Sequence, residues 1–134
     1  RTQAMLNHLM IGTSDIAKTK LFYNAVLGVL GAGDPIEHTN DTGHKRLFYI
    51  HDGSTFCISE PINDQPVTTA NGSTIGFVCT SPEQIKELHD VAVANGGVSV
   101  EDPPGPRNST MGVMHLCYFL DPDGHKICGI HRPK

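Results

Sequence analysis

The chain has 134 residues, of which 18% are charged, and its formal net charge at neutral pH is −4. This length suits one domain with a core of its own, and the slight excess of acid argues against nucleic acid or an anionic membrane surface as a partner. No apolar run approaches the roughly 18 residues of a membrane-spanning helix, and no leader is recognised. These features favour a cytoplasmic protein with a small-molecule ligand.

The N-terminal half predicts a short tail, a strand, a helix and a β-hairpin. The tail, Arg1 to Ala4, precedes Met5 and is interpreted as a remnant of cloning, with a natural tail as the alternative. Side chains at Ser14 and Asp15 can cap the helix, and Asp-Gly between two β-rich runs indicates a tight hairpin turn. The predicted ranges are 6–13 for the strand, about 16–27 for the helix, and 46–51 and 55–60 for the hairpin.

The C-terminal half predicts the same order of elements. Ser81 as N-cap, Pro82 at the first helical position and Gln84 as capping-box partner mark the start of its helix. Its hairpin, 115–120 and 126–131, again turns at an Asp-Gly pair. The polar segment 61–72 is expected to link the halves, and 101–110 to form a Pro/Gly-rich loop at the rim of a site.

The two halves repeat one pattern. NHLMIGTSDIAKTKLFYNAVLG from Asn7 resembles STIGFVCTSPEQIKELHDVAVA from Ser73, and LFYIHDGSTFCISEP from Leu47 resembles YFLDPDGHKICGIHR from Tyr118. Such a repeat fixes the architecture. We expect one α+β domain over 5–134, in which two βαβββ modules, about 5–61 and 72–132, form a curved, mostly antiparallel eight-stranded sheet with the helices outside.

The repeat also singles out four matching positions. Because alternate side chains of a strand point to one face, His8 and Met10 share a face, and Thr74 occupies the position that matches His8. In the closing strands Cys57 matches Cys128. All are expected to face a concave ligand-binding surface, although a register shift of one residue would turn Cys57 away from it.

The four cysteines stand singly within apolar runs. Since they form no CxxC pair, they indicate neither a disulfide scaffold nor a zinc ribbon. We expect most of them to be small buried hydrophobic residues. They are Cys57, Cys79, Cys117 and Cys128.

These features resemble the vicinal oxygen chelate superfamily, which includes glyoxalase I, bleomycin-resistance proteins and extradiol dioxygenases. The resemblance rests on the opening LNHLMIGTSDI, the helix KLFYNAVLG and the closing FLDPDGHKICGIH, within which DPDGxK is the most specific element. It implies paired modules, commonly in a homodimer, around a cleft in which metal-holding members place their ligands at the four repeat-related positions. Glyoxalase I uses His or Gln with two Glu, and the dioxygenases use two His and one carboxylate.

At those positions this chain has His8, Cys57, Thr74 and Cys128, so neither reaction carries over from the resemblance. Three interpretations stay open. The first is a metal-free pocket with His8 as a polar anchor, and the second is an altered zinc or nickel site with soft ligands. The third is an enzyme that uses other groups, with Glu60 as the candidate base.

Three further side chains are considered for the pocket. His44 and His115 occupy matching positions, at the same spacing that relates Leu47 to Tyr118, and either converge there or are solvated at strand ends. Arg107 either meets a ligand carboxylate from the rim or is an exposed loop residue. His125 flanks a turn, and we expect it to be exposed.

The predicted function is that of a glyoxalase-like protein which binds a small organic molecule in the cleft between the modules. If it is an enzyme, a lyase or isomerase activity is expected. The alternative is a non-catalytic protein that sequesters a toxic compound or antibiotic, as bleomycin-resistance proteins do. No cofactor is expected apart from a divalent metal, zinc or nickel, and the chain is expected to form a homodimer.

Overall fold

The computed structural model describes residues 4–133. Residues 1–3, most of the predicted N-terminal remnant, lie outside the described part, as does residue 134. The elements in chain order are β1 (Leu9–Gly12), α1 (Ile16–Val29), β2 (Ile36–Thr39), β3 (Lys45–His51), β4 (Ser54–Ser59), β5 (Ile75–Val78), α2 (Pro82–Ala94), β6 (Val98–Ser99), β7 (Gly105–Ser109), β8 (Gly112–Leu120) and β9 (Lys126–His131). Neither of the described helices is long and apolar enough to cross a membrane.

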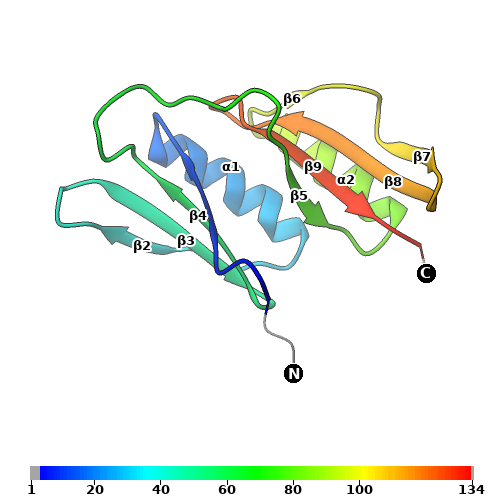
Figure 1. The fold of residues 1–134 in the computed structure, drawn as a ribbon, viewed down its shortest axis with the longest axis horizontal. Helices are drawn as coiled ribbons and strands as arrows, with labels where there is room; N and C mark the ends of the chain where they lie inside the picture. Colours follow the sequence, from blue (N-terminus) through cyan, green and yellow to red (C-terminus); the bar gives the residue numbers. More distant parts are fainter. Residues whose placement is uncertain (1–3, 134) are drawn as a thin grey trace.

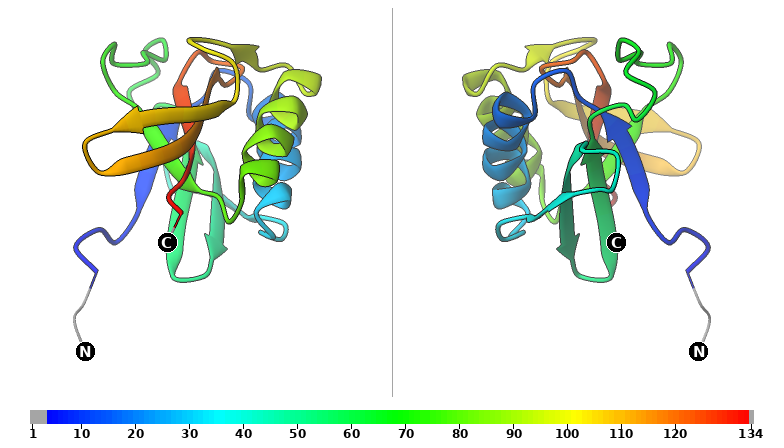
Figure 2. Two further views of the ribbon diagram at one scale, coloured as in Figure 1. Left: turned by 90° about the vertical axis from the view of Figure 1, so that its right-hand side faces the viewer. Right: turned by 90° about the vertical axis from the view of Figure 1, so that its left-hand side faces the viewer.

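The strands form two mixed sheets, one of four strands in the order β1-β4-β3-β2 and one of five, in which β5-β9-β8-β6 is extended by β7 on β8. In each sheet the opening strand lies parallel to the closing strand, and the other pairs are antiparallel. Both helices occupy one layer and the strands the other (Figures 1 and 2). The predicted α+β fold is confirmed, with the predicted single sheet divided into two that share no ladder among the described residues.

Capping residues define where both helices begin, as predicted. The Asp15 side chain accepts a hydrogen bond from the amide of Lys18 at 3.1 Å, and Ser81 Oγ accepts one from the amide of Gln84 at the same distance. Helix α1 continues beyond its predicted end at about residue 27, to Val29. Gly31 has a positive φ of +94°, a conformation that commonly follows the last turn of a helix. The chain therefore leaves the helix later than expected.

The predicted βαβββ order included no residue ranges for the strands at the sheet edges. β7 lies inside the segment predicted to be a loop, and it tolerates Pro106 because it is an edge strand that pairs only with β8. β2 and the short β6 carry little of the alternation on which the prediction relied, and both are fully exposed. These strands are defined by their pairing with β3 and β8 and not by local sequence.

Aromatic side chains from both sheets meet in one core beneath the helices. The ring centroids of Tyr23 on α1 and Phe56 on β4 are 5.0 Å apart, and those of Phe22 and Phe119 are 6.1 Å apart. Phe56 also contacts Phe77 on β5 edge to face at 5.4 Å. Since α1 packs on strands of both sheets, the helices hold the modules together in place of strand pairing.

The DPDG turn between β8 and β9 anchors the second module to the first. Tyr23 Oη donates a hydrogen bond to Asp121 Oδ2 at 2.6 Å, and the amide of Ser14 donates one to Asp123 Oδ1 at 3.0 Å. His125 Nε2 donates to the carbonyl of Gly12 at 2.8 Å. The expectation that His125 is exposed is therefore wrong, because this contact buries the residue to 6% exposure.

The residue spacing that relates the two copies of the repeat is one residue shorter in β3 and β8 than in the closing strands β4 and β9. Cys57 lies opposite Phe48, whereas Cys128 lies opposite Tyr118. Phe48 thus corresponds to Tyr118, although the sequence comparison matched Leu47 to Tyr118. The cause is the turn between β8 and β9, which is one residue longer between equivalent paired positions than the turn between β3 and β4.

Candidate ligand-binding face

Both sheets have one face that points away from α1 and α2, toward the viewer in Figure 1, and we call it the open face. Directly opposed residues of adjacent strands share a face. Two short rows cross it, one from each sheet, and the rows consist of Met10, Cys57 and Phe48, and of Gly76, Cys128 and Tyr118. The register thus places both thiols of the repeat on this face. Cys79 and Cys117 belong to the core on the helix side.

Neither open-face thiol is ionised at neutral pH. Cys57 is 1% exposed and Cys128 is 5% exposed. Burial raises the pKa of Cys57, and the positive charge of Arg46 offsets only part of that effect. Burial likewise raises the pKa of Cys128. In the metal-free protein both groups are thus small, buried and uncharged side chains of this face.

The two remaining family positions are exposed and stand at strand ends. His8 Nδ1 lies 2.8 Å from Asn7 Oδ1, outside β1, and Thr74 directly precedes β5. Over residues 4–133, no three or more His, Cys, Asp or Glu side chains are placed to hold a metal ion. One imidazole, one hydroxyl and two thiols do not fit the carboxylate-containing sites that the resemblance implies for a divalent ion.

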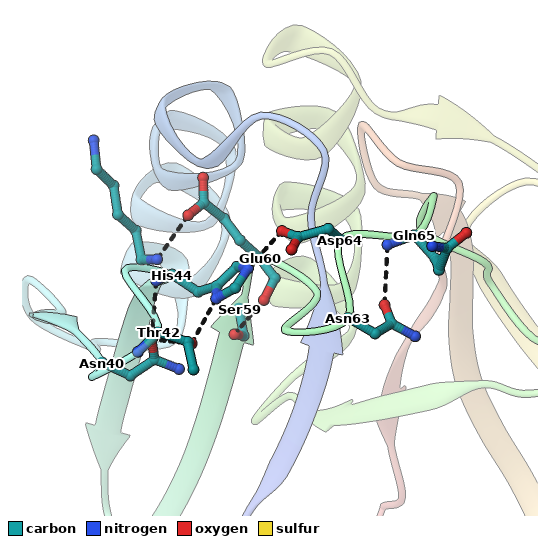
Figure 3. A network of polar contacts seen from close by, with 9 residues as sticks. Asn40, Thr42, His44, Ser59, Glu60, Asn63, Asp64 and Gln65 are labelled. Atoms are coloured by element: carbon teal, nitrogen blue, oxygen red, sulfur yellow. Dashed lines mark hydrogen bonds and ion pairs between the residues drawn. The ribbon is translucent and has the colours of Figure 1, made fainter.

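Glu60, the candidate base, closes the end of the β3–β4 hairpin. Its Oε1 accepts a hydrogen bond from the amide of Lys45 at 2.7 Å (Figure 3), and its own amide donates to the carbonyl of Lys45 at 3.0 Å. The carboxylate therefore has a structural partner already. Glu60 also borders the pocket described below.

The two histidines considered together do not converge. His44 Nε2 donates to Asp64 Oδ1 at 2.8 Å, and its Nδ1 lies 2.6 Å from Thr42 Oγ1 (Figure 3). His115 lies opposite His131, with ring centroids 6.2 Å apart. Its strand parity is that of Cys117, so it belongs to the helix side of the sheet. The expectation that His115 lines the pocket is wrong. The residue spacing between the two copies is one residue shorter in β8 than in β9, and this difference places His115 on the other face of the sheet.

Arg107 lies on β7 opposite Met114, and both belong to the open face. Its Nη2 donates to the carbonyls of Asp102 and Pro103, each at 3.0 Å, and its Nη1 donates to that of Gly105 at 3.2 Å. The guanidinium thus holds the loop before β7. The β7–β8 hairpin projects away from the helices and forms a side wall of the open face (Figure 2).

Sequence reasoning missed Arg46. On β3 it lies opposite Ser59, which in turn lies opposite Gly12. Its Nε is buried and has no hydrogen-bond partner among the described residues. It opens into a pocket of about 380 Å³, the Arg46 pocket, which is lined by residues 10–12, Arg46, and residues 59–63 and 66–68. The alternation in KRLFYIH could have revealed it, since Arg46 has the parity of Phe48 and hence of Cys57.

Three cationic side chains lie on the open face. They are Arg46, Arg107 and Lys126, and Lys126 forms an ion pair with Glu101. On the helix side, Glu37 pairs with Lys20 and Asp90 pairs with Lys86. Among the described residues, neither Arg46 nor Arg107 forms an ion pair.

Two modules with a shared core on the helix side and a pocket on the open face are typical of a class of small α+β proteins that bind ligands or metals. The model of the Glyoxalase/Bleomycin resistance protein/Dioxygenase superfamily matches residues 5–128. A crystal structure of a glyoxalase/bleomycin resistance protein from Albidiferax ferrireducens T118 is 46% identical, covers 96% of this chain and 100% of that chain, and has a TM-score of 0.87. The chain belongs to this superfamily, as the sequence resemblance predicted.

More distant structures share the fold alone. A family enzyme from Burkholderia phytofirmans PsJN is 17% identical, covers 96% of this chain and 98% of that chain, and has a TM-score of 0.69. A genomically encoded fosfomycin resistance protein from Listeria monocytogenes is 22% identical, covers 99% of this chain and 94% of that chain, and has a TM-score of 0.67. The same fold thus occurs in a protein described as an enzyme and in one described as a fosfomycin resistance protein.

Proposed function

We propose that this protein binds a small organic molecule on its open face, at the Arg46 pocket, without the metal centre of its catalytic relatives. The observation that carries this proposal is the state of the family's four ligand positions. Two of them hold buried, protonated thiols, Cys57 and Cys128, and neither is a carboxylate. The Arg46 pocket itself is lined by apolar side chains such as Met10, Ile62 and Val67, and these favour an apolar ligand body over a hydrated cation.

If the protein is not an enzyme, its proposed function is to sequester a toxic compound or antibiotic. Apolar and aromatic side chains, with Met10, Phe48 and Tyr118 in the two rows, supply contact area on the open face, and a few polar groups at the edges supply orientation. A lyase or isomerase activity is the second candidate. It rests on Glu60, which borders the Arg46 pocket, and it requires that the carboxylate leave the amide of Lys45.

A homodimer is part of the proposal. β1 and β5 each end a sheet, and unpaired edge strands favour association. Apolar side chains near these edges are open to solvent, with Met5 at 93%, Leu6 at 70% and Val78 at 76% exposure. Light scattering on the eluting peak of a gel-filtration column measures the mass, and a mass of one chain at micromolar concentration contradicts the dimer.

Metal titration tests the proposal against its metal-dependent alternative. Apo protein is mixed with zinc or nickel and the bound metal is measured by elemental analysis after desalting. We expect wild-type protein to retain almost none and the double variant Thr74→His, Cys128→Glu, which restores family ligand types, to retain markedly more. Retention of close to one ion per wild-type subunit would overturn the metal-free site.

Turnover separates the two forms of the function. The probe is the hemithioacetal that forms between a 2-oxoaldehyde and a thiol, and its isomerisation is followed spectroscopically. No turnover by wild-type protein, together with ligand-induced shifts of open-face resonances, supports the binding protein. Turnover that Glu60→Gln abolishes supports the enzyme instead.

A further inference from the structure

We infer that the ligand carries an acidic group, a carboxylate or a phosphoryl group, and that Arg46 binds this group. The inference rests on the proposed function, since it assigns a chemical class to the ligand of the same pocket. It starts from the isolation of Arg46. Among residues 4–133, no carboxylate forms an ion pair with its guanidinium, and its Nε is buried without a partner.

The place of Arg46 in the sheet explains why its charge is directed into the pocket. Ser59 and Gly12 extend the same row across β4 and β1. Gly12 has no side chain, and a Cβ built there would meet Val67 at 3.4 Å. Val67 thus covers the row from above, which leaves the guanidinium between the sheet and segment 61–68. Buried donors nearly always have partners in folded proteins, and an anionic group of the ligand can supply one here.

Other groups around the pocket fit an anion. Asn63 Oδ1 accepts a hydrogen bond from the amide of Gln65 at 3.0 Å (Figure 3), so the amino end of its side chain remains as a donor. Thr68 adds a hydroxyl to the same lining. Ser59 Oγ donates to the carbonyl of Glu60 at 2.7 Å and is not available as a donor.

One acid opposes this assignment and several features outweigh it. Glu60 borders the pocket, but its Oε1 is held by the amide of Lys45. Arg107 adds a second cation without an ion-pair partner among the described residues to the same face. A guanidinium presents a planar fork of donors that matches the two oxygens of a carboxylate or phosphoryl group. Arg46 is therefore a specificity-determining residue for an acidic ligand.

The test compares acidic and neutral probes of one shape. Benzoate, phenylphosphonate and the uncharged benzamide are titrated into wild-type protein, and dissociation constants are taken from amide chemical shifts of the open face. We expect both acids to bind at least about tenfold more tightly than benzamide, as one charge-assisted hydrogen bond implies. The tighter of the two acids identifies the source of the anionic group.

Two variants assign the effect to its residue. Arg46→Gln is expected to weaken both acids about tenfold or more and to leave benzamide unchanged, while Arg46→Lys retains part of the affinity. Lys18→Gln is the matched control, because it makes the same change of charge at an exposed position of α1 on the helix side. Far-UV circular dichroism and the thermal midpoint verify the fold of each variant.

The outcomes distinguish this inference from the function on which it rests. If benzamide shifts open-face resonances as strongly as the acids do, or if Arg46→Gln binds the acids as wild type does, the inference is overturned and the binding function stands. If no probe shifts any open-face resonance, both are overturned. The wild-type comparison of acid and amide decides the matter even if Arg46→Gln does not fold.

Discussion

The two sides of the sheets differ in how their side chains are packed. On the helix side, aromatic rings from both modules contact one another, and the DPDG turn is hydrogen-bonded across the module boundary. On the open face, Arg46 has an unpartnered Nε among the described residues, and large apolar side chains such as Ile50 and Val78 are exposed. Stability is therefore concentrated on one side, and the other side is free to vary with the ligand.

The largest expected effect is on the helix side. Phe119→Ala removes a fully buried ring that contacts Phe22 of the other module, and we expect a loss of about 3–5 kcal/mol in the free energy of unfolding. Phe48→Ala on the open face should cost less, because Phe48 is only half-buried. Urea denaturation measures both. Equal losses would contradict the difference between the two sides.

Two glycines allow the same comparison without loss of volume. A Cβ at Gly129 would lie 2.8 Å from Leu88 Cδ2 and 2.9 Å from Cys117 Sγ, whereas a Cβ at Gly76 would meet nothing within 4 Å. Gly129→Ala is expected to destabilise the fold by about 1–3 kcal/mol through overpacking. Gly76→Ala, its control, should change stability by no more than about 0.5 kcal/mol. A neutral Gly129→Ala in thermal unfolding would show that the core is looser than this geometry implies.

The stability contributed by the DPDG turn, which anchors the second module to the first, should depend on pH. Burial raises the pKa of Asp123, but hydrogen bonds from Ser14, Thr13 and Thr19 outweigh it and hold that pKa below the usual value of 3.8. A carboxyl group with a lowered folded-state pKa stabilises the fold above its unfolded pKa, and this contribution is lost as the pH falls through the folded value.

Asp123→Asn should therefore cost about 1 kcal/mol at pH 7. The difference from wild type should shrink when urea denaturation is repeated below about pH 4, where the wild-type carboxyl is protonated. Glu87→Gln, on the exposed surface of α2, serves as the control for a change of charge. A constant difference across this range would mean that the anchor does not depend on ionisation.

The smallest effect is expected for the ion pair of the open face. Lys126 is paired with Glu101 and its Nζ lies 4.9 Å from the ring centroid of Tyr118. Because both partners remain partly exposed, Lys126→Gln should cost about 0.2–1 kcal/mol, and the cost should diminish in high salt. Thermal unfolding at two salt concentrations measures it, and a loss as large as that of Phe119→Ala would refute the assignment of stability to the helix side.

The sequence predicted those parts of the fold that follow from local patterns. The capping residues Asp15 and Ser81, the hairpin at Asp52 and Gly53, and the parity of Cys57 all follow from short spacings. No ranges could be predicted for strands β2, β6 and β7, because their structure comes from pairing with a neighbour rather than from alternation of their own.

The candidate site was predicted less well, for a different reason. Matching repeated positions identifies where relatives place ligands, but it overlooks residues that only one module has, and Arg46 is such a residue. His115 was misplaced because an offset that holds for one strand was applied to the next. His125 was misjudged because its partner, the carbonyl of Gly12, lies in the other module and leaves no trace in nearby residues.

The longer turn before β9 has a consequence for how the halves depend on each other. It extends three polar side chains, Asp121, Asp123 and His125, into the first module, whereas the tighter turn at Asp52 and Gly53 offers nothing comparable in return among the described contacts. If the chain were divided, the C-terminal half would be left with a bared acidic and imidazole cluster, and the N-terminal half with only orphaned hydroxyls and a carbonyl. The two copies thus make unequal contributions to their shared boundary, because the later copy supplies most of the polar side chains that cross it.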